Sequence, residues 1–187
     1  GGFLGYYLVN SILYWNENNF SEKKINLTVL DNFIRGTPSW ITQIKEYKYY
    51  NLITHDIRHK IPEDFQKYNY IIHAASIASP IYYRKYPIET MDANISGLRH
   101  LLDYSVKNKK IIDGFLFFST SEIYGEPEIH PQPENYKGSV NNIGTRSCYI
   151  EGKRISESLC FDFFREFNTD IKVARIFNTY GPRMSAL

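Results

Sequence analysis

The chain has 187 residues, of which 43% are hydrophobic and 22% are charged, a composition typical of a folded globular domain and not of a disordered chain. The formal net charge is +2 and the lysines are scattered, so we expect no nucleic-acid partner. No apolar run approaches the roughly 18 residues of a membrane span. The only cysteines, Cys148 and Cys160, are too few for a disulfide framework, which indicates a cytoplasmic protein.

Apolar runs and helical patterns alternate from one end of the chain to the other. The predicted helices cover about residues 3–17, 87–108 and 146–167, with shorter ones after Pro38 and near residues 62–67. The predicted strands cover residues 25–30, 50–54, 70–74, 114–119 and 171–176. Residues 126–144 are rich in Pro, Asn and Gly and are expected to form a long loop. Strands that alternate with helices predict a mostly parallel sheet with right-handed crossovers.

The first predicted helix follows directly on a glycine turn. In a doubly wound sheet a central strand precedes such a helix, so we expect a truncated α/β domain that lacks its first strand. The two strands that neighbour this position would then expose unpaired edges. We therefore expect the 187 residues, expressed alone, to fold only marginally.

Gly2 and Gly5 match the last two glycines of a G-x-x-G-x-x-G turn. Glycine allows the backbone to approach a pyrophosphate closely, and the following helix offers free N–H groups and a positive dipole end. Asp31 ends the next predicted strand, where a carboxylate would accept hydrogen bonds from ribose hydroxyls and favour NAD over NADP. A plain glycine loop and an ordinary turn aspartate are the alternative interpretations.

Tyr149 and Lys153 are four positions apart on a predicted helix, which places both on one helix face. Only about 0.1% of a free phenol is ionised at neutral pH. A neighbouring ammonium favours the phenolate, and a pKa lowered by about three units corresponds to roughly 4 kcal/mol. We therefore expect Lys153 to lower the pKa of Tyr149 and make it a usable base. The spacing alone is common in a chain with 16 tyrosines, and its position after the fourth predicted strand gives it weight.

Ser119, Thr120, Ser121 and Glu122 are at the end of a predicted buried strand. Groups at the carboxyl ends of parallel strands line the ligand crevice of α/β sheets, so these side chains offer hydrogen-bond donors and a possible acid or base. A Ser/Thr cap of the following turn is the alternative. Cys148 adjoins Tyr149 and is expected to be a packing residue, not a nucleophile. The five histidines show no metal-ligand spacing, so no metal site is expected.

Together these residues resemble the UDP-glucuronate decarboxylases (UDP-xylose synthases), which belong to the extended short-chain dehydrogenases with the sugar-nucleotide epimerases and 4,6-dehydratases. The resemblance extends from Gly2 to Met184. It rests on residues 30–33 (LDNF), 73–80 (HAASIASP), 119–125 (STSEIYG), 130–134 (HPQPE), 146–154 (RSCYIEGKR) and 174–184 (ARIFNTYGPRM). It implies a Rossmann-type doubly wound parallel sheet, of which residues 1–187 form a partial NAD-binding domain without the first strand and without the C-terminal substrate lobe.

The resemblance also implies a tightly held NAD, a UDP-sugar substrate and a homodimer. Tyr149 would remove the proton of the sugar 4-hydroxyl, Thr120 and Tyr149 would stabilise the charge that develops, and Glu122 would assist proton transfer. Ser121 and Asn178 match positions beside the sugar nucleotide. The positions that match cofactor contacts are Gly2, Gly5, Asp31, Asn32, Asp56, Ile57, Ser119, Tyr149 and Lys153.

The implied reaction is the NAD-dependent decarboxylation of UDP-glucuronate to UDP-xylose through a 4-keto intermediate. In the 4,6-dehydratases the triplet reads Thr-Asp-Glu, and its aspartate protonates the departing hydroxyl; Ser121 cannot, which favours decarboxylation. A 4,6-dehydratase or 4-epimerase of a related sugar nucleotide is the alternative. A non-catalytic NAD-binding module is a remote alternative, against which the intact Thr120, Tyr149 and Lys153 set speaks.

Overall fold

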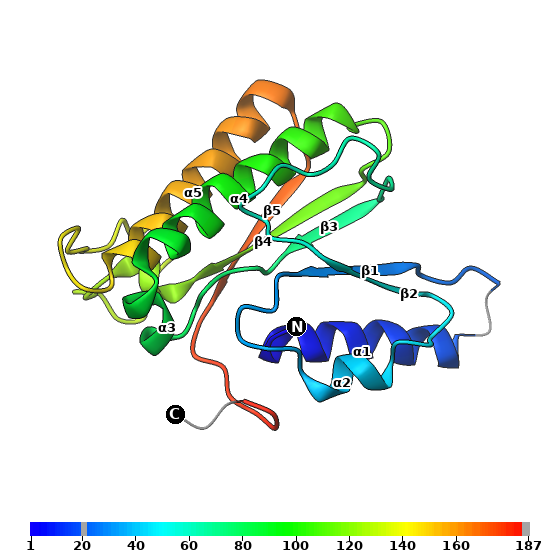
Figure 1. Ribbon diagram of the computed structural model, residues 1–187. Coiled ribbons are helices and arrows are strands. Elements are labelled where there is room, and N and C mark those ends of the chain that lie inside the picture. Colours follow the sequence, from blue (N-terminus) through cyan, green and yellow to red (C-terminus); the bar gives the residue numbers. More distant parts are fainter. Residues whose placement is uncertain (20–21, 185–187) are drawn as a thin grey trace. The chain divides into compact units, whose positions relative to one another are not determined.

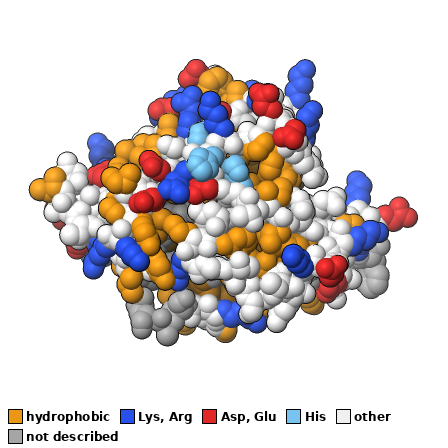
Figure 2. Space-filling view, in the orientation of Figure 1, with side chains coloured by type: hydrophobic (Ala, Val, Ile, Leu, Met, Phe, Trp, Pro, Cys, Tyr) orange, Lys and Arg blue, Asp and Glu red, His pale blue; other side chains and the backbone are white. Residues whose placement is uncertain are grey.

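A computed structural model describes residues 1–19 and 22–184 of the chain, and its elements are shown in Figure 1. The chain divides into two compact units: unit 1 contains residues 1–56 and 180–187, and unit 2 contains residues 57–179. None of the helices in the described part of the chain has the length and apolar character that a membrane span requires. On the face shown in Figure 2, acidic and basic side chains are interspersed.

Unit 1 is a two-stranded parallel sheet with two helices. Its elements are α1 (Phe3–Asn18), β1 (Leu27–Asp31), α2 (Ser39–Gln43) and β2 (Tyr50–Thr54). The two strands pair in parallel, with Asp31 opposite Thr54. A small core joins the helices to the sheet, and its buried members are Val9, Leu13, Trp40, Ile41 and Tyr50.

Unit 2 is a three-stranded parallel sheet in the order β3-β4-β5. Its elements are β3 (Tyr70–His73), α3 (Pro80–Lys85), α4 (Pro87–Lys107), β4 (Gly114–Thr120), the 3-10 helix η1 (Ser121–Tyr124), α5 (Ser147–Phe167) and β5 (Ile171–Ile176). Helices α4 and α5 lie side by side over one face of this sheet (Figure 1). The main core lies between them and β4; its members are Leu98, Leu102, Phe115, Phe117, Cys160 and Phe163.

Close contact between α4 and α5 depends on a glycine. A Cβ atom at Gly152 of α5 would come within 3.3 Å of the Asn94 side chain on α4. Asn94 is fully buried, its amide donates to the Thr90 carbonyl, and its carbonyl oxygen accepts from the Ser76 hydroxyl. Because Gly152 stands between Tyr149 and Lys153, this packing fixes the helix that carries both predicted catalytic side chains.

The predicted α/β class with parallel strands is confirmed. The strands form two separate sheets, β1-β2 and β3-β4-β5, and no strand among the described residues pairs with both β1 and β3. The helix predicted near residues 62–67 is wrong: Phe65 N donates to Pro62 O in a single turn that does not continue. Helices α3 and η1 were not predicted; α3 begins at Pro80, and proline suits the first helical position.

Candidate active site

Two of the predicted cofactor-binding residues are at the start of α1 in unit 1. The first helical hydrogen bond runs from Tyr6 N to Gly2 O at 2.9 Å. The N–H groups before Tyr6 point out of the helix end, as at every α-helix N-terminus. No side chain caps this end and no acidic residue stands in its first turn. A Cβ atom at Gly2 or Gly5 would meet nothing within 4 Å, so the surface there is open to a phosphate.

Three further predicted residues lie at the carboxyl ends of β1 and β2 in the same unit. The Asp31 carboxylate accepts from the Phe33 N–H at 2.7 Å and also from the Gly1 nitrogen. The Asn32 amide donates to the Asp56 carboxylate at 3.1 Å. An open glycine turn at a helix N-terminus, beside carboxylates at the strand ends, is a donor and acceptor set that fits the pyrophosphate and ribose of a dinucleotide.

The predicted catalytic residues gather in unit 2, around the end of β4 and the start of α5. Tyr149 is 6% exposed, and its ring stacks on that of Tyr83 from α3, with centroids 5.4 Å apart and planes within 8°. The Thr120 hydroxyl accepts from the Glu122 N–H at 3.2 Å and is close enough to Tyr149 to lower the pKa of its phenol. The structure thus brings Thr120, Glu122 and Tyr149 into one cluster.

The prediction that Lys153 lowers the pKa of Tyr149 is wrong. Burial raises the pKa of Tyr149 to about 12, the nearby Thr120 hydroxyl opposes the rise, and the negative charge of Glu122 adds to it. Lys153 contributes little because its Nζ donates to the Phe118 carbonyl at 2.7 Å and stands 5.9 Å from the centre of the Tyr149 ring. Loss of hydration therefore outweighs the charge of the lysine.

Lys153 is itself removed from water. It is 3% exposed, and burial lowers its pKa to about 7 despite the opposing influence of Cys160 and Glu157. Its Nζ lies 4.8 Å from the centre of the Phe117 ring. A lysine that exchanges its proton near neutral pH can serve in proton transfer as well as in electrostatic stabilisation.

Glu122 is held by an arginine that the sequence analysis did not single out. Arg146 Nη2 lies 2.6 Å from Glu122 Oε2, and this ion pair raises the pKa of Arg146. Arg146 precedes α5 as its N-cap residue. The pair therefore connects η1 to the start of the helix that carries Tyr149.

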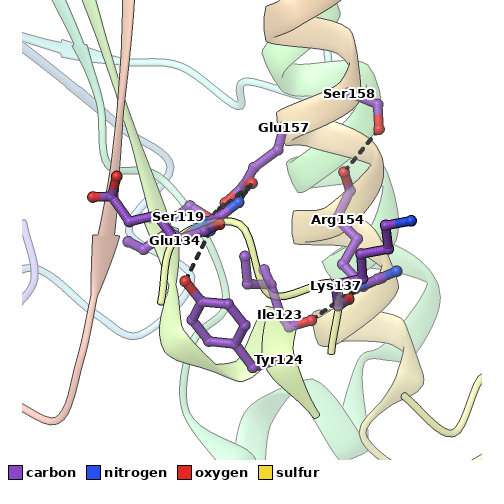
Figure 3. A network of polar contacts seen from close by, with 9 residues as sticks. Ser119, Ile123, Tyr124, Glu134, Lys137, Arg154, Glu157 and Ser158 are labelled. Atoms are coloured by element: carbon purple, nitrogen blue, oxygen red, sulfur yellow. Dashed lines mark hydrogen bonds and ion pairs between the residues drawn. The ribbon is translucent and has the colours of Figure 1, made fainter. Parts of the chain in front are cut away.

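Ser119 is engaged within the protein. Its hydroxyl donates to Glu157 Oε1 at 2.5 Å, and Figure 3 shows Glu157 extending from α5 toward Ser119. The same carboxylate pairs with Arg175 of β5, whose Nη2 lies 2.8 Å from Glu157 Oε2. Arg175 Nη1 also donates to the Tyr124 hydroxyl at 2.8 Å and to the Glu134 carbonyl at 2.6 Å. One buried carboxylate thus connects α5, the end of β4 and β5.

The loop of residues 126–144 is fastened to this network. Arg154 of α5 donates to the Ile123 carbonyl at 2.8 Å and to the Lys137 carbonyl at 3.0 Å (Figure 3). Gly125 has φ of 65°, and a Cβ atom there would lie 1.9 Å from the Ser139 carbonyl oxygen. Only glycine can take this conformation beside that backbone, so the loop has a fixed place beside η1.

The other predicted residues of unit 2 are less closely tied to the cluster. Ser121 opens η1 and is partly exposed, and Asn178 is exposed just after β5. Ile57 is partly buried beside α4, where its carbonyl lies 3.2 Å from His100 Nδ1. Gly2, Gly5, Asp31, Asn32 and Asp56 belong to unit 1.

Sequence reasoning missed four residues of this cluster: Tyr83, Arg146, Glu157 and Arg175. One signal was present, because Glu157 stands four positions after Lys153 and so shares its helix face. Arg175 stands between apolar residues near the end of β5 (IKVARI), which is a second sign of a buried partner. Nothing local points to Tyr83, since its stacking partner is far away in the sequence.

These features define a class of protein, an α/β domain of Rossmann type with a Tyr-Lys pair beside the end of a central strand. The profile of the NAD dependent epimerase/dehydratase family matches residues 1–186. The chain belongs to the NAD dependent epimerase/dehydratase family.

Individual relatives refine the comparison. The chain is 41% identical over 184 residues to UDP-glucuronic acid decarboxylase 3 of Arabidopsis thaliana, a match that covers 98% of this chain and 50% of that protein. A UDP-glucose 4-epimerase of Thermotoga maritima is 25% identical with a TM-score of 0.76, over 98% of this chain and 55% of that one. A dTDP-glucose 4,6-dehydratase of Streptomyces venezuelae has a TM-score of 0.82 at 20% identity, over 97% of this chain and 55% of that one. The chain spans about half the length of the curated relatives it matches first.

Proposed function

We propose that the full-length protein is a UDP-glucuronate decarboxylase that forms UDP-xylose and carbon dioxide with a bound NAD. The observation that carries the proposal is the 41% identity, over 98% of this chain, to a relative named as such a decarboxylase. Thr120, Glu122, Tyr149 and Lys153 support it, because they supply the groups that oxidation at a sugar hydroxyl requires.

In this proposal the chain binds the cofactor through a helix N-terminus and through residues at strand ends. Gly2, Gly5 and the N-terminus of α1 take the pyrophosphate, and the residues at the strand ends take the adenosine. The adenosine contacts are Asp31, Asn32, Asp56 and Ile57, and the contacts nearer the reacting end are Ser119, Tyr149 and Lys153. Bound NAD would supply the hydride acceptor for C4 and a positive ring charge that favours the phenolate.

Tyr149 is the proposed general base for the sugar 4-hydroxyl. With a pKa of about 12, Tyr149 is protonated at neutral pH, and the positive ring charge of NAD would favour its phenolate. Lys153, whose pKa is about 7, is placed to exchange a proton on the same helix face. Thr120 would donate to the oxygen on which negative charge develops after oxidation.

The serine at position 121 favours decarboxylation over dehydration. Carbon dioxide leaves unaided once C4 is a ketone, because the electrons of the broken bond are delocalised onto the ketone oxygen. Elimination of water needs an acid, which a serine hydroxyl cannot supply at neutral pH. A small hydroxyl at this position also leaves space for a sugar carboxylate. Asn178 would contact the sugar nucleotide after β5.

The direct test is to incubate the full-length protein with UDP-glucuronate and measure carbon dioxide and the mass of the nucleotide product. Release of carbon dioxide with formation of UDP-pentose is the expected result. We also expect Ser121→Asp to lower turnover, since an aspartate would repel the sugar carboxylate. A 4-keto-6-deoxy product from a hexose nucleotide, without carbon dioxide from UDP-glucuronate, would contradict the proposal.

A 4-epimerase is the second candidate. The solved structure of a 4-epimerase is 25% identical to this chain, and epimerisation needs only the Tyr149 chemistry together with rotation of the keto-sugar. The same assay separates the two, because an epimerase returns a product of unchanged mass and releases no carbon dioxide.

We further propose that the full-length protein is a cytoplasmic homodimer. Phe161 and Phe164 of α5 are 49% and 51% exposed, an apolar surface that a second copy of the same helix would cover. The free cysteines, Cys148 and Cys160, suit a reducing compartment. Sedimentation of the full-length protein should give a dimer, and the double change Phe161→Glu, Phe164→Glu should give a monomer.

A further inference from the structure

The ion pair between Arg146 and Glu122 lies beside the proposed base. The backbone of each residue is held by hydrogen bonds. The Glu122 N–H donates to Thr120 Oγ1, and the Arg146 carbonyl accepts from the N–H of Tyr149 and of Ile150, at 3.1 Å each. The arginine side chain is 44% exposed and the glutamate side chain 28% exposed. The contact is a single one, from Nη2 to Oε2 at 2.6 Å.

We propose that Arg146 is a positioning residue that holds the Glu122 carboxylate beside Tyr149 and Thr120 during the chemical step. The proposal rests on the proposed function, in which Glu122 assists proton transfer. Arg146 acts through Glu122 and does not itself contact the reacting atoms.

Geometry supports this role over a purely structural one. Glu122 is in a short 3-10 helix, and a partly exposed carboxylate there would rotate into solvent without a partner. A partly exposed ion pair contributes little to stability, so the fold does not depend on this contact. A displaced proton-transfer group, by contrast, lowers turnover strongly, because a displacement of about 1 Å can cost about a hundredfold.

The groups around Glu122 also explain why its place matters. Burial raises the pKa of the two stacked phenols, Tyr83 and Tyr149, and the negative charge of Glu122 adds to the rise of both. Arg146 lies beside Tyr83 and opposes this rise there. A carboxylate that moved away would therefore change both the proton path and the charge at the base.

The test is a double-mutant cycle in the full-length, NAD-loaded protein, with Arg146→Met, Glu122→Gln and the double variant. We expect Arg146→Met to lower kcat about tenfold, with KM for UDP-glucuronate changed less than twofold. In a protein that already carries Glu122→Gln, Arg146→Met should lower kcat less than twofold, because the group that Arg146 positions is already disabled. Arg165→Met is the matched control, since Arg165 is on the same helix in an exposed pair with Asp162.

Two outcomes would overturn the proposal: additive losses in the double variant, or an Arg146→Met variant with a raised KM and an unchanged kcat, which would make Arg146 a substrate ligand. If Arg146→Met does not fold, Arg146→Lys enters the cycle instead. A lysine can replace a single-nitrogen contact in part, so we expect a two- to fivefold loss in kcat that disappears on the Glu122→Gln background.

An error in the proposed function would be seen in a different measurement from an error in the role of Arg146. A wild-type protein that releases no carbon dioxide from UDP-glucuronate would contradict the decarboxylase assignment alone. The cycle could then be measured on the reduction of bound NAD by UDP-glucose, because oxidation at C4 also begins the epimerase and dehydratase reactions. Additive losses there would overturn the role of Arg146 whichever reaction follows.

Discussion

Burial shifts the pKa values of Tyr149 and Lys153 in opposite directions, because the ionised phenol is an anion and the ionised lysine is a cation. Removal from water raises the pKa of the phenol to about 12 and lowers that of the lysine to about 7. In both cases burial favours the neutral form.

If Tyr149 is the base, loss of its hydroxyl should stop the chemistry and leave binding intact. We expect Tyr149→Phe to reduce kcat at least a hundredfold and to leave NAD binding within about twofold, because the stacking ring remains. Lys153→Met should lower both kcat and the affinity for NAD, since the lysine is expected to contact the cofactor. Steady-state turnover and NAD titration measure the two effects. Retention of more than a few per cent of turnover in Tyr149→Phe would contradict the assigned role.

The same burial predicts a pH-dependent stability. The pKa of Lys153 falls from 10.5 to about 7 on folding, so between these values the unfolded chain binds a proton that the folded protein does not. Stability should therefore rise with pH across this range, and the full cost of the buried ammonium should be present below pH 7. We expect Lys153→Met to remove this slope and to stabilise the NAD-free protein by about 2 kcal/mol near neutral pH.

Urea unfolding of the NAD-free, full-length protein at several pH values measures this prediction. Other titrating groups are common to the two proteins, so the difference between wild type and Lys153→Met isolates the lysine. A difference that does not change with pH, or a variant that is less stable than wild type at neutral pH, would contradict it.

At the scale of elements, Glu157 joins the helix of the Tyr-Lys pair to two strands and a loop. Its carboxylate accepts from Ser119 at the end of β4 and from Arg175 of β5, and Arg175 also reaches the loop carbonyl of Glu134. The hydrogen bonds with Glu157 raise the pKa of Arg175. Glu157 is almost fully buried, so water cannot replace Arg175 as the partner of its carboxylate.

Removal of Arg175 should therefore be costly. We expect Arg175→Met to destabilise the full-length protein by about 3 kcal/mol, because it leaves a buried carboxylate without its cation. The matched control is Lys172→Met on the same strand, where an exposed pair with Asp170 contributes little, about 0.5 kcal/mol or less. Denaturant unfolding compares the two. Equal effects would show that the buried network does not stabilise the fold.

The elements also show what sequence could and could not predict. Apolar patterning located the long helices and the strands β1 to β5 to within two residues, because the alternation of apolar runs with turn residues marks each of them. It gave no sign of α3 or η1, which are too short for a period to appear. The spacing of Tyr149 and Lys153 predicted a shared helix face but not the sign of the pKa change of Tyr149, because burial depends on Tyr83 and on packing that is distant in the sequence.

At the scale of the whole chain, strand pairing is incomplete among the described residues. β1 pairs with β2, and β3 pairs with β4, in two separate parallel sheets. Tyr70 and Ile72 of β3 are exposed, and unpaired strand edges with apolar side chains promote association. The two-stranded sheet of unit 1 has a small core, and a sheet of that size is marginal in isolation.

We therefore expect residues 1–187, expressed alone, to unfold without cooperativity or to associate through these edges. Circular dichroism during heating should show a broad transition, and size-exclusion chromatography should show material larger than a monomer. The full-length protein is the control and should melt in a steep transition, because a complete doubly wound sheet pairs every internal strand on both sides. A single sharp transition from a monomeric 187-residue chain would show that β1 and β3 need no further partner.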